Sequence, residues 1–265
     1  MSRLDIDLRF GPPPTHYGMM ADASFIETRK LLAVERLIRL VTASHQAALI
    51  FGDAGLGKTT AVRYVLIVKM NKPFAEVTFS GSPHSRENLD TLHQAILGRP
   101  GIGTAAKIEA ELRRAVRESD VILVVDEVES IKIERLTAIR KLQDVPGARL
   151  TVIYIGDAGS KRRMQEDKRL ADRILTSLEF KKMNFEQFIE SISDYHPLYK
   201  GVPRAVVKRL HADVLNGRWR AIAKFTLCAQ FVIDFDDELE GERSLSNTDV
   251  VSRATRLFWD GAFRA

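Results

Sequence analysis

The sequence has little cysteine and no long hydrophobic run. Among its 265 residues there is one cysteine, Cys228, which excludes an internal disulfide and a zinc site built on several thiols. No apolar stretch approaches the roughly 20 residues that span a bilayer. The first ten residues, MSRLDIDLRF, carry two acids where a signal peptide needs an apolar region. We therefore expect a cytoplasmic protein without a membrane partner.

The composition is typical of a folded protein with a small excess of positive charge. Hydrophobic residues make up 45% of the chain, which allows a real core and argues against disorder. The 40 basic and 35 acidic residues give a formal net charge of +5, which permits a polyanionic partner without requiring one. At this length we expect one main domain and a smaller companion.

Apolar patterning divides the chain into three parts. Residues 1–24 include a run of three prolines and are expected to form an extended arm. Between 25 and 180, short apolar runs alternate with helical patterns. Two of these runs, 121–125 and 150–155, are continuous, as in strands buried on both faces. This part is predicted to be an α/β domain with a parallel sheet between helices.

The remainder of the chain, 181–265, shows helical patterns only and is expected to be a small α-helical domain. Within it, segment 234–242 carries six acids and no base. We interpret this segment as a solvated loop.

A phosphate-binding motif follows the first expected strand. Residues 52–59 match G-x-x-x-x-G-K-[ST] between a strand and a helix. The glycines permit a turn that aims backbone N–H groups at phosphate, and the helix N-terminus adds positive potential. Lys58 would neutralise the β- and γ-phosphates of ATP, and the Thr59 hydroxyl would ligate Mg²⁺. The expected nucleotide-binding residues are Gly52, Asp53, Ala54, Gly55, Leu56, Gly57, Lys58, Thr59 and Thr60.

Two adjacent carboxylates end the buried run 121–125. Strand alternation would point Asp126 and Glu127 in different directions. Asp126 can hold Mg²⁺ through water, while Glu127 can polarise a water for in-line attack on the γ-phosphate. Together with the phosphate-binding loop, this pair predicts a Mg²⁺-dependent ATPase.

With these residues in place, the chain resembles an AAA+ ATPase over roughly 25–230. The stretch VVDEVESIKIERLTAIRKLQDVPGARLTVIYIG is similar to the DNA-transposition regulators of the MuB, TnsC and TniB kind. The resemblance implies an AAA+ core with a C-terminal helical lid. It also implies a protein that binds ATP, assembles as a filament or ring on double-stranded DNA, and recruits or activates a transposase, with a targeting protein as a further partner. ATP hydrolysis would then drive release.

The resemblance also implies two nucleotide sensors. Asp157 follows the strand 150–155, where AAA+ proteins place the sensor-1 residue, although the family more often has Asn or Thr there. The alternative is that Asp157 is a turn residue. Arg220 lies in Gly-Arg-Trp-Arg, 217–220, which fits the G-x-x-R pattern that opens a lid helix and places the sensor-2 arginine on the nucleotide.

An arginine finger from the neighbouring subunit is the third implied element. Arg173 is our candidate, with a solvated salt bridge as the alternative role. Its competitors in the same basic segment are Arg162, Arg163 and Arg169.

DNA contacts are expected from the region 81–107, because related regulators hold DNA through core loops and helices. The candidates are Arg86, Arg99 and Lys107. The sequence shows no recognition-helix pattern, so binding should be dominated by the phosphate backbone and weakly sequence-specific.

A second hypothesis makes the chain an AAA+ adaptor or loader, similar to IstB or to helicase loaders, that acts mainly through a protein partner. Assembly promoted by DNA in the absence of any protein partner would favour the transposition regulator over the adaptor or loader. A small-molecule kinase would leave Asp126, Glu127 and the motif at 217–220 without a role. An ABC-type ATPase is excluded because the sequence has no L-S-G-G-Q-like run.

Overall fold

The structure, a computed structural model, describes residues 23–79, 85–239 and 246–259. Apart from its last two residues, the arm expected at 1–24 lies outside these ranges. The chain forms two compact units. The described part of the first, which we call the core unit, is Arg29–Asp53 and Lys58–Phe180 without 80–84. The second, which we call the helical unit, combines the described residues of 23–28 and 181–265 with Ala54–Gly57.

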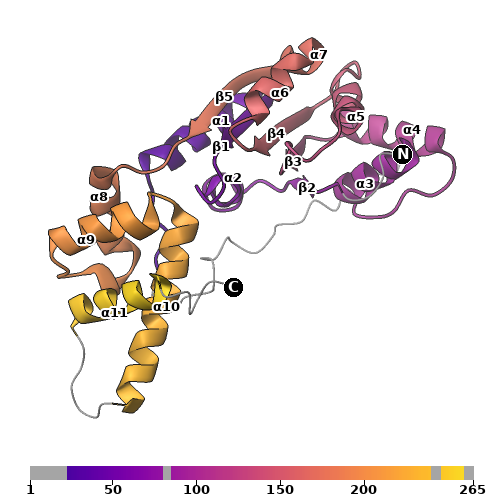
Figure 1. Ribbon diagram of the computed structural model, residues 1–265. Coiled ribbons are helices and arrows are strands. Elements are labelled where there is room, and N and C mark those ends of the chain that lie inside the picture. Colours follow the sequence, from indigo (N-terminus) through magenta and orange to yellow (C-terminus); the bar gives the residue numbers. More distant parts are fainter. Residues whose placement is uncertain (1–22, 80–84, 240–245, 260–265) are drawn as a thin grey trace. The chain divides into compact units, whose positions relative to one another are not determined.

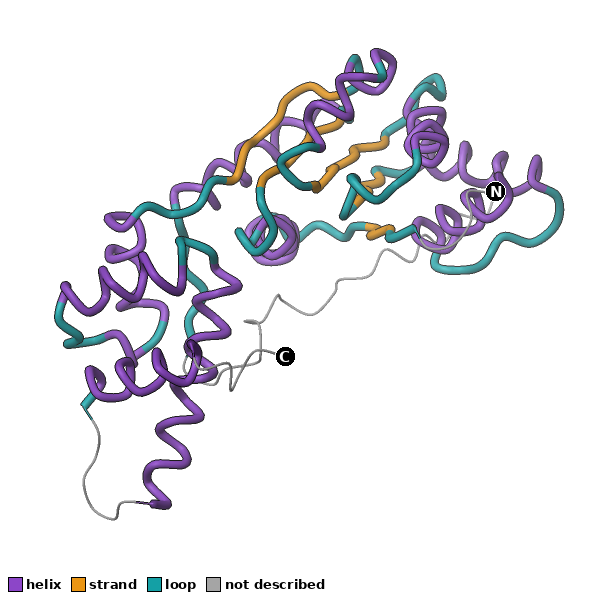
Figure 2. The backbone as a smooth tube through the Cα atoms, in the orientation of Figure 1, coloured by secondary structure: helices purple, strands orange, loops and turns teal. Residues whose placement is uncertain are grey.

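A parallel sheet forms the centre of the core unit (Figures 1 and 2). In the described residues its strands are ordered β2-β3-β4-β1-β5, and every paired strand is parallel to its neighbour. Their bounds are β1 (Ala47–Gly52), β2 (Ala75–Val77), β3 (Val121–Val125), β4 (Leu150–Gly156) and β5 (Ile174–Phe180). The predicted α/β fold with a parallel sheet is confirmed.

Helices connect the strands and cover the sheet (Figure 1). They are α1 (Arg29–Ser44), α2 (Lys58–Tyr64) with a π-helical turn (Val65–Lys69), α3 (Ser85–Leu97), α4 (Ala105–Glu118), α5 (Ile133–Gln143), α6 (Ser160–Glu166) and α7 (Lys168–Ala171). The helix α4 illustrates why these segments are helical. The Thr104 side chain caps its first turn by accepting a bond from the Lys107 N–H, and Ile108, Leu112 and Ala115 recur on its buried face.

The central strands are buried on both faces, as their continuous apolar runs predicted. In β1, alternate residues such as Leu49 pack in one hydrophobic cluster with residues of α3, α4 and α5. The intervening residue Ile50 is also fully buried, and α1 and α2 contact β1. This sandwich gives a rigid sheet whose strand ends can hold polar groups in fixed places.

The helical unit contains α8 (Phe185–Tyr195), a 3₁₀ turn (Pro197–Tyr199), α9 (Arg204–Leu210), a π-helical turn (His211–Leu215), α10 (Trp219–Leu239) and α11 (Asn247–Trp259). Asn184 begins α8 with a capping box shared with Gln187. Phe188, Tyr195 and Phe225 lie in the core of this unit. None of the described helices of either unit is both long and apolar enough to cross a membrane.

The prediction of a loop at 234–242 is wrong for residues 234–239, because α10 continues to Leu239. A helix that has already formed adds each further residue at little cost, and acidic residues do not break it. A side-chain hydrogen bond of 2.9 Å from Gln230 to Asp234, one turn apart, supports the continuation.

Candidate nucleotide-binding site

The order of the strands brings three separate sequence motifs to one edge of the sheet. The strand β4 lies between β1 and β3, and all three are parallel. Their carboxyl ends therefore meet at the same edge, which is where open α/β sheets bind ligands. The phosphate-binding loop follows β1, Asp126 follows β3, and Asp157 follows β4.

A hydrogen bond joins the phosphate-binding loop to the end of β3. The Thr59 hydroxyl donates to Oδ2 of Asp126 at 2.7 Å, and Oδ1 of Asp126 accepts from the Glu127 N–H at 2.8 Å. Hydroxyl and carboxylate oxygens are ligands that suit Mg²⁺, which usually keeps several waters and substrate oxygens as its other ligands. The oxygens of Thr59 and Asp126 therefore fit a partly hydrated ion of this kind. In the described residues no group of three or more His, Cys, Asp or Glu side chains could hold a metal.

Lys58 bonds back to its own loop. Its Nζ donates to the carbonyls of Gly52 at 2.7 Å and Asp53 at 2.9 Å. Burial lowers the pKa of Lys58, and the carboxylates of Glu129 and Asp126 are the strongest of the charges that oppose this shift. The ammonium thus lies half-buried among carboxylates, where a polyphosphate would find a cation and a set of backbone donors.

The tip of the phosphate-binding loop, Ala54–Gly57, belongs to the helical unit. Gly55 and Gly57 have φ values of +77° and +85°, which favour glycine. The Arg220 N–H donates to the Gly55 carbonyl at 3.1 Å, and a Cβ on Gly55 would lie 3.0 Å from Cβ of Arg220. Both the backbone conformation and the neighbour therefore require glycine at position 55. Of the remaining predicted loop residues, Leu56 is buried, whereas Ala54 and Thr60 are exposed.

Glu127 occupies a left-handed backbone conformation with φ +54°. The strand β3 ends at Val125, so the change of direction between Asp126 and Glu127 comes from this turn, not from strand alternation. Ser130 holds the turn, because its N–H and its hydroxyl both donate to the Glu127 carbonyl, at 2.9 and 2.8 Å. The Glu127 side chain is exposed at the carboxyl edge of the sheet.

Asp157 takes part in the turn that begins α6. Its Oδ1 accepts from the Ser160 hydroxyl at 2.9 Å, and its N–H donates to Oε2 of Glu129 at 3.0 Å. These bonds fit the alternative interpretation of Asp157 as a turn residue. They also reveal Glu129, which the sequence reasoning missed, since an acid three residues after Asp126 matches no motif.

Arg173 lies at the opposite edge of the sheet. It directly precedes β5, whose last residue, Phe180, is paired with Gly52. A seven-residue strand is about 20 Å long, so the Arg173 side chain starts far from its own phosphate-binding loop. Its guanidinium forms an ion pair with Asp144 and is 45% exposed. The structure therefore places Arg173 away from the nucleotide-binding motifs of its own chain.

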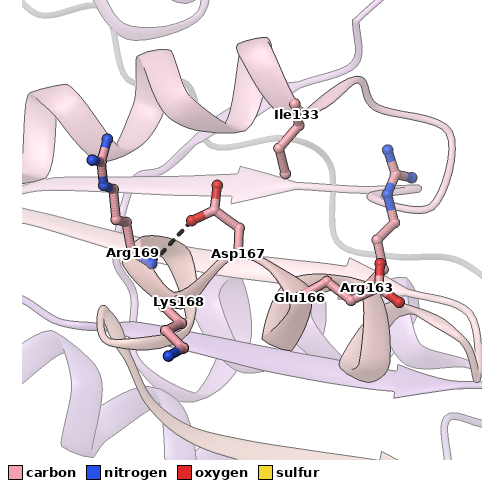
Figure 3. Close-up of a pocket in the computed structure, with 6 residues that line it drawn as sticks. All are labelled: Ile133, Arg163, Glu166, Asp167, Lys168 and Arg169. Carbon is pink, nitrogen blue, oxygen red and sulfur yellow. Dashed lines mark hydrogen bonds between the residues drawn. The ribbon is translucent and has the colours of Figure 1, made fainter.

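The competing arginines differ sharply from one another. The Arg163 guanidinium donates to three backbone carbonyls of the loop after Glu127, those of Val128, Glu129 and Ile131. Arg162 is 89% exposed. Figure 3 shows Arg163 and Arg169 in a pocket that is also lined by Ile133, Glu166, Asp167 and Lys168.

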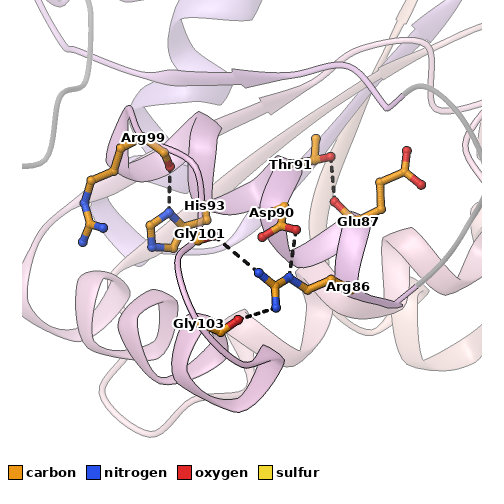
Figure 4. A network of polar contacts seen from close by, with 8 residues as sticks. All are labelled: Arg86, Glu87, Asp90, Thr91, His93, Arg99, Gly101 and Gly103. Atoms are coloured by element: carbon orange, nitrogen blue, oxygen red, sulfur yellow. Dashed lines mark hydrogen bonds and ion pairs between the residues drawn. The ribbon is translucent and has the colours of Figure 1, made fainter.

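Two of the three predicted DNA contacts hold the segment that joins α3 to α4 (Figure 4). Arg86 donates to Asp90 at 2.9 Å and to the Gly103 carbonyl. Arg99 donates to Glu111 at 2.7 Å. The buried His93 has one ring nitrogen 2.8 Å from the Arg99 carbonyl and the other 3.0 Å from Glu111. The third predicted contact, Lys107, is exposed on α4.

Comparisons with known proteins show what this chain is similar to. Residues 41–164 match the model of an AAA domain. No curated protein matches the sequence. The fold is similar to that of the ORC2 protein of Aeropyrum pernix in its ADPNP-ADP complexes, with 17% identity and a TM-score of 0.63 over 95% of this chain and 72% of that one.

Further solved structures share the fold. The ORC1 protein of Aeropyrum pernix, in complex with DNA, is 13% identical, with a TM-score of 0.60 over 89% of this chain and 67% of the other. The RuvB Holliday junction branch migration motor of Thermotoga maritima is 12% identical, with a TM-score of 0.58 over 92% and 72%. Residues 41–164 thus resemble an AAA domain, and the chain has the fold of the AAA+ ATPases.

Proposed function

We propose that this chain is a Mg²⁺-dependent ATPase that assembles on double-stranded DNA in the cytoplasm and regulates transposition by recruiting or activating a transposase. The observation that supports the ATPase best is the 2.7 Å hydrogen bond between Thr59 and Asp126. It joins two motifs that lie 67 residues apart. Lys58 lies among the same carboxylates.

The proposed chemistry divides the work among these residues. Lys58 and the backbone N–H groups of the loop would bind the β- and γ-phosphates, and Thr59 and Asp126 would hold Mg²⁺. The ion would neutralise charge on the phosphates. Glu127 accepts a proton from a water molecule as the oxygen of that water bonds to the γ-phosphorus. The bond to the β–γ bridging oxygen breaks, and ADP and phosphate leave.

Substitution of the proposed base tests the ATPase. Glu127→Gln should lower the rate of phosphate release by about 100-fold or more while it leaves binding of a fluorescent ATP analogue unchanged. An unaltered rate of hydrolysis would reject Glu127 as the base. Arg113→Ala is the control, because this exposed side chain of α4 forms an ion pair with Glu109 away from the motifs.

Nucleotide-dependent assembly is the second part of the proposal. Arg173, at the far edge of the sheet, is the proposed finger that completes the site of a neighbour. Asp157 and Arg220 are the proposed γ-phosphate sensor and lid contact. Negative-stain microscopy with double-stranded DNA should show filaments or rings with a slowly hydrolysed ATP analogue and none with ADP. Glu127→Gln with ATP should give assemblies that persist.

DNA binding is supported by the resemblance of the segment from Val124 to Gly156 to transposition regulators and by the basic charge of the chain. The similar ORC1 structure is a complex with DNA, and RuvB is a branch migration motor. Lys107 is the cleanest contact to test, because Arg86 and Arg99 also hold a loop. Lys107→Ala should weaken binding on all sequences and reduce the slope of log affinity against log salt by about 1.

The adaptor or loader role is the second candidate function. It is favoured by the internal bonds of Arg86 and Arg99, because both would have to give up partners to reach phosphate. Assembly that is indifferent to DNA and appears only with a protein partner would support this role over the first.

A further inference from the structure

Arg163 makes an unusual set of contacts for a half-buried side chain. Its Nη1 donates to the carbonyl of Val128 at 3.1 Å and to that of Glu129, and its Nη2 donates to the carbonyl of Ile131. All three acceptors belong to the loop that follows Glu127. The rigid fork of a guanidinium can bond to several oxygens in one plane, which a lysine ammonium cannot reproduce.

The loop that Arg163 holds contains the strained residue of the site. The φ of +54° at Glu127 costs free energy for any residue other than glycine, and persists only where the surroundings fix it. Ser130 bonds to the Glu127 carbonyl, and the Val128 N–H donates to the Ile155 carbonyl of β4 at 3.0 Å. Arg163 adds the bonds that connect the rest of the loop to α6.

A second connection between the loop and the start of α6 uses a side chain of the loop as the acceptor. The Glu129 carboxylate, from the same loop, accepts from the Asp157 N–H at 3.0 Å and lies 3.5 Å from the Ser160 hydroxyl, at the start of α6. Among the charges that act on Lys58, that of Glu129 is the strongest. The loop 128–131 and the helix α6 are therefore fixed to each other through both main chain and side chain.

We propose that Arg163 is a positioning residue for ATP hydrolysis: it holds the loop 128–131 and thereby keeps the Glu127 carboxylate where it can take a proton from the attacking water. This inference rests on the proposed ATPase function. Arg163 does not touch the nucleotide in this role. Its removal should impair the chemical step and spare Lys58 and Thr59, because their hydrogen bonds to Gly52, Asp53 and Asp126 lie outside the loop 128–131.

The test measures binding and turnover separately in Arg163→Ala and the control Arg113→Ala. A misplacement of about 1 Å can cost about 100-fold in rate, so kcat of Arg163→Ala should fall by about 10- to 100-fold. The dissociation constant of a non-hydrolysable ATP analogue should change by less than about twofold, because the loop of residues 52–59 is intact. The control should match the wild type in both.

Chemical rescue distinguishes positioning from a general loss of structure. Arg163 lines the pocket of Figure 3, and truncation to alanine leaves room there for a small cation. Added guanidinium chloride at millimolar concentration should raise the kcat of Arg163→Ala, and an equal concentration of sodium chloride should not. Should Arg163→Ala melt below the assay temperature, Arg163→Lys replaces it, with the same expected loss of kcat at unchanged nucleotide affinity.

Three results would overturn the inference. The first is a wild-type kcat in Arg163→Ala, or in Arg163→Lys where that variant replaces it, and the second is a parallel loss of kcat and nucleotide affinity. The third is recovery of activity when Arg163→Ala protomers are mixed with Glu127→Gln protomers, which would show that Arg163 acts on a neighbour. Wild-type protein that binds ATP without hydrolysing it would instead reject the proposed function itself.

Discussion

The left-handed turn at Glu127 predicts that the proposed catalytic base also lowers the stability of the protein. An L-residue in this conformation costs about 1–2 kcal/mol, which glycine avoids, while glycine loses about 0.5–1 kcal/mol more in backbone entropy on folding. Glu127→Gly should therefore be more stable than Glu127→Ala by about 0.5–1 kcal/mol. Both variants lack the carboxylate, so both should lose hydrolysis.

Equilibrium unfolding in urea without nucleotide, followed by circular dichroism, measures this difference. With an m-value of about 2 kcal/mol/M, the two midpoints should differ by about 0.3–0.5 M. Gly147→Ala provides the opposite control. Gly147 has φ +76°, and a Cβ there would meet no described atom within 4 Å, so this variant acquires the backbone cost without a clash and should lose stability by a similar amount.

The comparison of glycine with alanine at position 127 makes the reasoning refutable. Equal midpoints for Glu127→Gly and Glu127→Ala, together with a clear loss in Gly147→Ala, would show that Glu127 is not held in the left-handed region. Hydrolysis at the wild-type rate in either variant would show that the carboxylate at 127 is not the base.

Three further predictions use other parts of the chain. The hydrogen bond from His93, with help from Arg99, lowers the pKa of Glu111 below its ordinary value of 4.5, so its contribution to stability is present above pH 4.5 and is lost as the pH falls through the lowered value. Glu111→Gln should reduce the loss of stability with falling pH below 4.5, measured by acid unfolding. An unchanged acid unfolding curve would contradict this role of Glu111. Gly217→Ala should destabilise the helical unit by about 1–3 kcal/mol, measured by urea unfolding, because φ is +63° and the new Cβ would lie 2.1 Å from the Met183 carbonyl oxygen; wild-type stability would refute this. Lys58→Ala should abolish calorimetric binding of ATP with Mg²⁺ and leave the melting temperature of the free protein nearly unchanged, whereas retained affinity would remove Lys58 from the site.

The features that the sequence predicts well are those set by local patterns. Continuous apolar runs at 121–125 and 150–155 become buried strands within one residue of the expected ends. The spacing of glycines in 52–59 predicts a loop between strand and helix, and the two glycines of its tip have the positive φ that this loop requires. Both patterns depend on residues close together in the sequence, so they can be recognised without knowledge of the fold.

The features that were not predicted depend on contacts between distant segments. That β4 separates β1 from β3 is a property of the sheet, and only this order puts Asp157 between the other two motifs. Arg163 looked like one more base in a basic segment, because bonds to backbone carbonyls more than 30 positions away leave no trace in residue identity. The turn at Glu127 could not be predicted either, since a glutamate does not indicate a left-handed backbone conformation.

The two opposite edges of the sheet give each protomer a direction. A phosphate-binding loop at one edge and Arg173 at the other can serve a common nucleotide only when copies stack head to tail, so the contact uses two different surfaces and need not close on itself. If Arg173 completes the site of a neighbour, as proposed, every junction of an open stack holds a complete site, and one terminal protomer is left with an unassisted nucleotide. Turnover per protomer would then rise with stack length, and short stacks would be poor enzymes. A ring has no such end.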